Sequence, residues 1–393
     1  MRSSAAAPTA VTEPLYTRHF STASASHFLL GMGFWMFVVF PLHLAELGAS
    51  TARIGLLIAL EPTAAVLVRP ALGGLMAERG RGWILRAGGA LNVVAVALYA
   101  LIGDVGAGMA AVRILHGVGI GALFTTFFTY AADISPVTRR TEGLAVFGIS
   151  GILPTALAPA LGEELVLRAG FPAMFLAAIA FSIASLVFTW RLHEPDADLD
   201  TADTHGFWQI AADRSRLGVW LTAFIFSLAM SSYVAFLEPY AHTRGFERAS
   251  VFFLAYSFAA VLLRTFGRTL PDRVGPRRIL VPALASLGAG LYLVARFDAL
   301  TGLGAAGLLC GMGHGYLFPI LSSMAIEGAD RRRRGSAMSF FTAVFDLGQM
   351  VGPPVFGLIA EAAGYPTMFL TAMAGVWASL GGWIVVNVRE VRT

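Results

Sequence analysis

Twelve apolar segments follow one another along this chain, each long enough to cross about 30 Å of bilayer as a helix. They lie near residues 20–44, 53–77, 83–103, 107–131, 143–167, 171–191, 217–241, 249–270, 279–296, 299–325, 335–359 and 366–387. Only 13% of the residues are charged, against about 25% in soluble domains. A bilayer offers the backbone no water, so each segment must pair its own amides and carbonyls, as a helix does. The sequence therefore predicts an all-α integral membrane protein.

The arginines predict how these segments are oriented. All 28 basic residues are arginines, which is typical of a GC-rich bacterial genome. When the loops are assigned alternately to two sides, 20 arginines lie on one side, five on the other and three within segments. Because positively charged loops stay in the cytoplasm, we expect a protein of the bacterial inner membrane with both termini cytoplasmic. Residues 1–17 are expected to form a disordered cytosolic tail.

One stretch, an apolar run that contains a single arginine and ends in a charged turn, occurs twice. Residues 64–82 read AAVLVRPALGGLMAERGRG, and residues 259–278 read AAVLLRTFGRTLPDRVGPRR. Arg264 follows Arg69 by 195 residues. The repeat predicts two similar halves of six helices, which lie at 18–192 and 217–393 and are joined by a cytosolic linker at 193–216.

Small residues and prolines repeat in the same way. LHGVGIGALF at 115–124 matches LCGMGHGYLF at 309–318, at an offset of 194 residues. Small residues let helices approach closely in lipid, where packing replaces the hydrophobic effect. The predicted helix-packing residues are Gly117, Gly121, Pro154, Pro159, Gly162 and Pro353.

Four stretches resemble signature motifs of the major facilitator superfamily. They are GLMAERGR at 74–81, DRVGPRR at 272–278, RILHGVGIG at 113–121 and GISGILPTALAPALG at 148–162. The last resembles the glycine-proline signature of drug and proton antiporters. The resemblance implies the twelve-helix superfamily fold, alternating access, a small-molecule substrate, protons as coupling ions and a functional monomer in the lipid bilayer.

Charged residues that occur in both halves have two possible roles. Arg69 and Arg264 lie about two turns inside their helix ends, where they could bond helix-end carbonyls and reach the interface, or could bind an anion. The loops that follow them resemble the family's cytoplasmic gate, which implies that they hold the halves together; solvated loop charge is the alternative. The gate residues are Gly74, Glu78, Arg79, Asp272, Arg273 and Gly275.

Charged and polar residues found in one half only are the candidates for a proton or substrate site, because one substrate lacks two-fold symmetry. A charge within an apolar segment costs about 2.5–3.5 kcal/mol, and a buried carboxylate there can carry a proton or stay permanently paired. Arginine cannot release a proton, so it would act through an acid or hold substrate. The histidines could titrate near neutral pH or be packed. The set is Glu61, Arg113, His116, Glu238, His314, Asp346 and Gln349.

Enzyme and nucleic-acid functions find no support in the sequence. It contains no HExxH, GxSxG or phosphate-binding GxxxxGK motif. Cys310 is alone, which excludes disulfides and a cysteine metal site. We therefore expect neither a metal nor a cofactor, and the topology explains the arginines without nucleic acid.

The function predicted from these features is proton-coupled secondary transport that exports small amphipathic molecules by antiport. One alternative is a proton-linked transporter of an anionic metabolite that uses the intramembrane arginines. Another is a receptor or scaffold that moves no solute.

Overall fold

The computed structural model describes residues 14–136, 139–194, 209–267, 269–327 and 334–392. Most of the predicted tail and of the linker lies outside these ranges. The helices before the linker are α1 Arg18–Trp35, η1 Met36–Val38, α2 Phe40–Glu46, α3 Thr51–Arg79, α4 Arg81–Tyr99, α5 Ala107–Asp133 and α6 Arg140–Thr189. Those after it are η3 Arg214–Arg216, α8 Leu217–Thr243, α9 Ser250–Phe266, α10 Leu270–Val274, α11 Pro276–Arg296, α12 Leu300–Ile326 and α13 Arg334–Arg392.

Nine helical spans in the described part of the chain are long and apolar enough to cross a membrane. Two of them, in α6 and α13, are of double length, and each contains one glycine with positive φ, Gly170 (74°) and Gly364 (83°). Glycine adopts this conformation without steric cost, so each glycine lets one crossing turn into the next. Dividing these two spans and adding the shorter apolar helix α9 gives the twelve predicted segments. The all-α membrane fold is confirmed.

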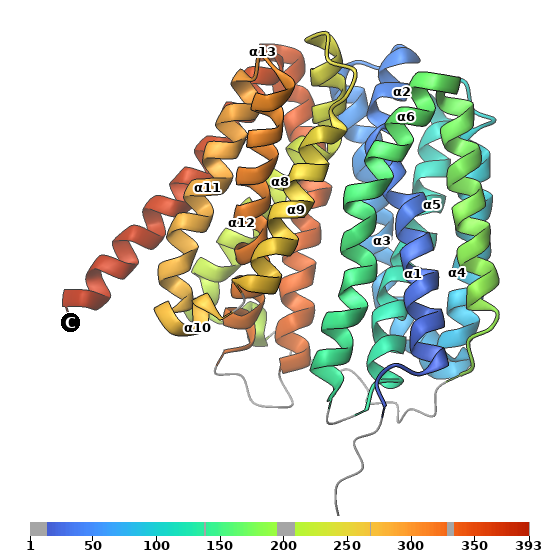
Figure 1. The fold of residues 1–393 in the computed structure, drawn as a ribbon, viewed down its shortest axis with the longest axis horizontal. Coiled ribbons are helices and arrows are strands. Elements are labelled where there is room, and N and C mark those ends of the chain that lie inside the picture. The colour runs from blue at the N-terminus through green and yellow to red at the C-terminus, as the bar shows by residue number, and fades with distance from the viewer. Residues whose placement is uncertain (1–13, 137–138, 195–208, 268, 328–333, 393) are drawn as a thin grey trace, which may run out of the picture.

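Two bundles stand side by side in Figure 1, with α1 to α6 in one and α8 to α13 in the other. The start of α1 and the end of α13 lie at the same end of the molecule. We call that end the arginine-rich face, because 20 arginines are predicted from the sequence to lie on the side of the two termini, and the opposite end the arginine-poor face.

Glycines bring corresponding helix pairs together in the two halves. A Cβ added to Gly117 in α5 would collide with the backbone of Glu61 in α3. Gly311 in α12 meets the backbone of Tyr256 in α9 in the same way. The glycines of both repeats therefore allow backbone contact between neighbouring helices.

The other residues selected for packing lie mostly at similar contacts. A Cβ at Gly31 in α1 would come within 2.7 Å of Pro154 Cγ, and one at Gly121 within 2.7 Å of Ala65 Cα. Gly162 faces Met36, Pro353 faces Gly55, and Pro159 lies inside α6.

The two halves meet along α3 with α13 and along α6 with α9. Near the arginine-poor face, the backbone of Pro353 leaves no room for a side chain on Gly55. The backbone N–H of Ala52 donates to Glu361 Oε2 over 2.9 Å. These contacts join the start of α3 to the first crossing of α13 near the arginine-poor face.

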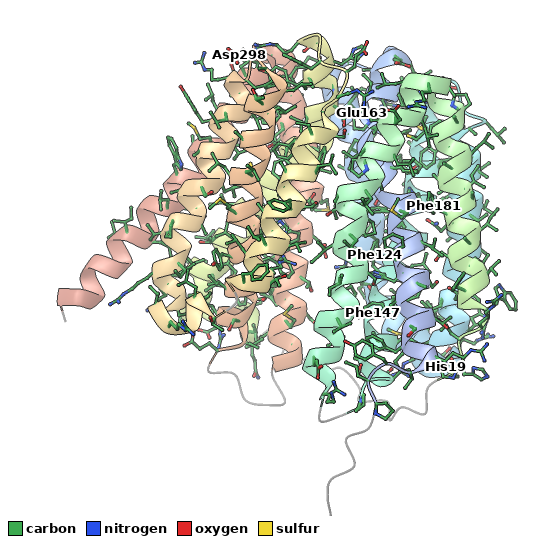
Figure 2. All side chains as sticks on the ribbon, viewed as in Figure 1. His19, Phe124, Phe147, Glu163, Phe181 and Asp298 are labelled. Carbon is green, nitrogen blue, oxygen red and sulfur yellow. The ribbon has the colours of Figure 1, made fainter. Side chains whose placement is uncertain are left out.

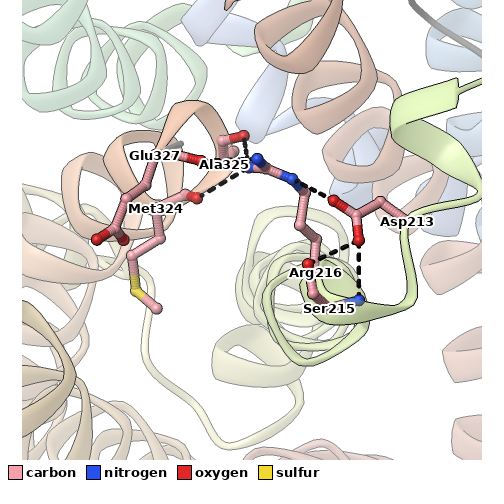
Figure 3. A network of polar contacts seen from close by, with 6 residues as sticks. All are labelled: Asp213, Ser215, Arg216, Met324, Ala325 and Glu327. Carbon is pink, nitrogen blue, oxygen red and sulfur yellow. Dashed lines mark hydrogen bonds and ion pairs between the residues drawn. The ribbon is translucent and has the colours of Figure 1, made fainter. Parts of the chain in front are cut away.

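The end of the linker is anchored on the second half (Figure 3). Arg216 donates to the carbonyls of Ala325 and Glu327, at 2.5 and 2.6 Å, where the end of α12 leaves carbonyls without helical partners. Asp213 accepts hydrogen bonds from the hydroxyl and backbone N–H of Ser215 and pairs with Arg216 at 2.9 Å. These bonds, that of the Ser215 hydroxyl above all, lower the pKa of Asp213.

Candidate substrate site between the two halves

A cavity of about 400 Å³ lies between the halves. Its walls come from α1, η1, α2, α3 and α5 on one side and from α8 and α13 on the other. A mostly apolar wall with a few convergent polar groups is typical of small-molecule sites. The aromatic side chains of the wall are Phe34, Trp35, Phe37, Phe124 and Phe345, and the charged ones are Glu61, Arg69, Arg113 and Asp346.

Glu61 and Arg113 form an ion pair within the first half, with 2.9 Å between Oε2 and Nη2. Both are buried, with 8% and 2% of their surface exposed. Arg113 also donates to the carbonyl of Ile58 over 2.9 Å. That carbonyl lacks its usual helical donor, because the residue four positions later is Pro62, which has no N–H. Arg113 therefore satisfies both a carboxylate and a gap in the α3 hydrogen-bond ladder.

Arg69 and Asp346 form an ion pair that joins the two halves, from α3 to α13. Their side chains are 34% and 21% exposed, and both line the cavity. The Nε atom of Arg69 is buried without a partner. Glu61 and Arg69 are both on α3, yet each pairs with a residue of a different helix.

Gln349 and His116 make contacts within their own halves. The Gln349 amide donates to the carbonyl and hydroxyl oxygens of Ser227 in α8, at 2.8 and 3.1 Å, while the residue still lines the cavity. His116 is buried, with Nδ1 3.3 Å from the Tyr99 hydroxyl and its ring beside Phe37. His116 lies behind the cavity wall and Gln349 in it.

A second cavity, of about 280 Å³, adjoins the first. Four residues line both cavities: Trp35, Met230, Val234 and Phe345. The second cavity is bordered by Arg264 and His314, and the Tyr256 hydroxyl forms a hydrogen bond with His314 Nδ1. Arg264 and His314 were both predicted from the sequence, but nothing in the sequence indicated that they share a cavity.

Two buried carboxylates lie towards the arginine-poor face. Glu238 in α8 is 4% exposed, and its Oε1 has no hydrogen-bond partner. Glu163 in α6, also 4% exposed, accepts hydrogen bonds from the backbone N–H and the hydroxyl of Ser250 at the start of α9. Figure 2 places Glu163 in the upper part of α6, beside the second half.

Glu163 was not among the residues predicted from the sequence. The residue lies one turn after Pro159 on α6, which was the available signal that it faces the neighbouring half.

The predicted gate residues make few contacts where the structure describes them. Glu78, Arg79 and Arg273 are exposed, and a Cβ at Gly74 or Gly275 would meet open space. The side chain of Asp272 lies outside the described set. Arg81, which was not among the predicted gate residues, pairs with Asp133 at 2.8 Å within the first half.

The fold and the cavity define a membrane transporter that has a solute-sized site between two six-helix halves. In the described ranges, no three His, Cys, Asp or Glu side chains gather as metal ligands would. The Major Facilitator Superfamily profile matches residues 23–268 and 247–391, so the chain belongs to this superfamily, which comprises transporters and not enzymes.

Two relatives in this superfamily have export or resistance in their names. The chain is 24% identical to the staphylopine export protein of Staphylococcus aureus over 353 residues. This alignment covers 85% of this chain and 87% of that protein. The chain is 23% identical over 380 residues to multidrug resistance protein MdtG of Yersinia enterocolitica, with coverages of 90% and 89%.

Solved transporter structures share the fold. The nucleoside transporter NupG superposes with a TM-score of 0.75 at 15% identity, over 94% of this chain and 99% of that one. A bacterial homologue of the lysosomal transporter Spinster gives 0.78 at 12% identity, over 96% and 97%. At these identities the likeness shows the arrangement of helices alone.

Proposed function

We propose that this protein is a proton-coupled antiporter that exports small amphipathic molecules across a bacterial inner membrane. The observation that carries the proposal is the presence of two intramembrane carboxylates, Glu61 and Asp346, on the wall of one cavity, each paired with an arginine. The arginine-rich face is assigned to the cytoplasm, and one chain is taken as the functional unit.

Protonation of Asp346 would weaken the contact between the two halves. Its ion pair with Arg69 crosses the interface, so protonation removes an attraction between α3 and α13. A substrate with a positive group would compete with the proton for the same carboxylate. Proton and substrate would then occupy the site alternately, as antiport requires.

Glu61 is the second carboxylate that could bind a proton, and its partner Arg113 lies in the same half. Protonation of Glu61 leaves the Arg113 charge compensated only by neutral carbonyl and hydroxyl oxygens. A buried arginine without its carboxylate is costly, so the energy of this cavity wall would depend on the proton. Glu61 thus adds a second group at which protons and substrate can compete.

Access from the cytoplasm is supported by the contacts near the arginine-poor face. Ala52 with Glu361, and Glu163 with Ser250, join the halves there, while Glu78 and Arg79 at the opposite face are exposed. Export would begin from this arrangement, with substrate entering from the cytoplasm. The gate residues would close that face in the alternate state.

The names of the relatives agree with an export direction, since one is a staphylopine export protein and another a multidrug resistance protein. The aromatic side chains of the cavity suit the apolar part of such molecules.

Transport in proteoliposomes tests the proposal. Ethidium carries a permanent positive charge. A proton antiporter should use an imposed pH gradient to move this dye in the direction opposite to the protons. We expect Glu61→Gln and Asp346→Asn to reduce gradient-driven ethidium transport at least tenfold. Glu142→Gln, at an exposed surface ion pair with Arg139, is the matched control and should transport like the wild type.

Two results would contradict the proposal. One is wild-type transport that is indifferent to the pH gradient. The other is gradient-driven transport that both carboxylate variants retain.

A further inference from the structure

Arg264 is an arginine within the membrane whose charge has no carboxylate beside it. No acidic residue lines the second cavity, and no ion pair to Arg264 exists in the described part of the chain. Its Nε atom is buried and lacks a hydrogen-bond partner. Arginine stays charged at any physiological pH, so this site is electropositive.

The groups around Arg264 are neutral hydrogen-bonding side chains. Tyr256 and His314 bond each other, Tyr233 lies 3.5 Å from the Tyr256 hydroxyl, and Thr155 and Ser257 share a hydrogen bond of 2.9 Å. All five line the cavity. An uncompensated guanidinium next to hydroxyl groups is the donor arrangement that binds a carboxylate.

The second cavity adjoins the first along shared walls. Trp35, Met230, Val234 and Phe345 border both, so one molecule can lie against these apolar side chains and reach polar groups on either side. On one side are the carboxylates Glu61 and Asp346, and on the other is Arg264.

We infer that the second cavity is an anion subsite, where Arg264 binds an acidic group of the exported molecule. The inference rests on the proposed function and adds to it a preference for amphipathic molecules that carry a carboxylate or a similar anion. A molecule with an additional basic group would place that group towards Asp346 and its acid towards Arg264.

Binding of a matched pair of probes tests the subsite. The probes are tritiated 3-(2-naphthyl)alanine and its amide, which share the aromatic body and the amine, but only the first has a carboxylate. With wild-type protein in nanodiscs, we expect the acid to bind about tenfold more tightly than the amide. Arg264→Gln should remove this preference and leave amide binding unchanged, while Arg264→Lys should retain most of it.

Arg168→Gln is the control, because it removes the same charge from an exposed position outside both cavities. It should keep the preference for the acid. An equal affinity of the wild type for acid and amide, or undetectable binding of the acid, would overturn the inference. So would a preference that survives in Arg264→Gln, or an equal loss of both probes in that variant, which would mark a structural role.

The outcome is separable from that of the proposed function. A failed subsite leaves the dependence of ethidium transport on Glu61 and Asp346 intact. Failed proton coupling leaves the difference between acid and amide intact.

Discussion

The two cavities lie between the halves, at places that the sequence repeat makes equivalent, and they differ in charge. Offsets of 194 and 195 residues relate wall positions of the first to those of the second. The corresponding pairs are Glu61 with Tyr256, Arg69 with Arg264, Asp346 with Ile152, and Ile120 with His314. Both cavities keep the arginine, but only the first has acids to pair with its charges.

The difference separates scaffold from specific function. The repeated glycines allow the same backbone contacts in both halves, whereas the acids on which the proposed proton coupling depends line only the first cavity. The second cavity keeps an uncompensated positive charge. Under the two proposals, the protein responds to protons at the first cavity and selects its substrate at the second.

The largest effect is expected on stability. Arg113 has a carboxylate partner and Arg264 has none, so their removal should have different costs. Arg113→Met should lower the free energy of unfolding by about 3–5 kcal/mol, because it leaves buried Glu61 without its partner. Chemical denaturation of the detergent-purified protein measures this. Arg264→Met is the matched control, and a loss as large as that of Arg113→Met would mean that the two arginines do not differ.

The next largest effect is expected from breaking the contact between Glu163 and Ser250, which joins the two halves near the arginine-poor face. Glu163→Ala removes hydrogen bonds to a carboxylate, which contribute about 1.5–3 kcal/mol to the contact between α6 and α9. Spin labels at Glu142 and Val274, on the arginine-rich face, should report a shorter mean distance in the variant. An unchanged distribution would show that this contact does not control the halves.

A tenfold effect is expected when the second cavity is given the missing acid. Ile152→Asp places a carboxylate at the position equivalent to Asp346, where it can pair with Arg264. The affinity for 3-(2-naphthyl)alanine should then fall by about tenfold, which corresponds to about 1.4 kcal/mol. Ile152→Asn has nearly the same shape without the charge and should bind the acid normally. Equal losses in the two variants would point to shape and not charge.

The reverse change should have the smallest effect. Asp346→Asn leaves Arg69 unpaired, as Arg264 is, so the first cavity should gain affinity for 3-(2-naphthyl)propionate, which has the carboxylate but no amine. We expect a gain of about threefold to fivefold, because Arg69 is 34% exposed and water screens its charge. Equilibrium binding in nanodiscs measures it, and a loss of affinity would contradict the equivalence of the cavities.

The sequence predicted the fold well because membrane solvation imposes it locally. Each apolar segment must form a helix by itself, so twelve segments could be placed before their packing was known. The two acids of the first cavity, Glu61 and Asp346, could be identified for a similar reason, since a charge in an apolar segment is rare.

The partners of these acids depend on packing between helices and were not predictable. Arg69 and Asp346 are 277 positions apart and meet only through the docking of the halves. Arg113 was expected to act through an acid, yet its contact with Ile58 depends on how α5 lies against the gap made by Pro62. Glu163 and Glu164 are adjacent in sequence, and only the orientation of α6 decides which is buried against α9.

Proton release by purified protein in weak buffer tests the central claim most directly. Ethidium is added to the wild type, Glu61→Gln and Asp346→Asn, and the pH change is recorded; the dye has no proton to give near neutral pH. Competition at the paired carboxylates predicts proton release from the wild type and reduced release from each variant. Ethidium binding without proton release, or equal release from all three proteins, would contradict it.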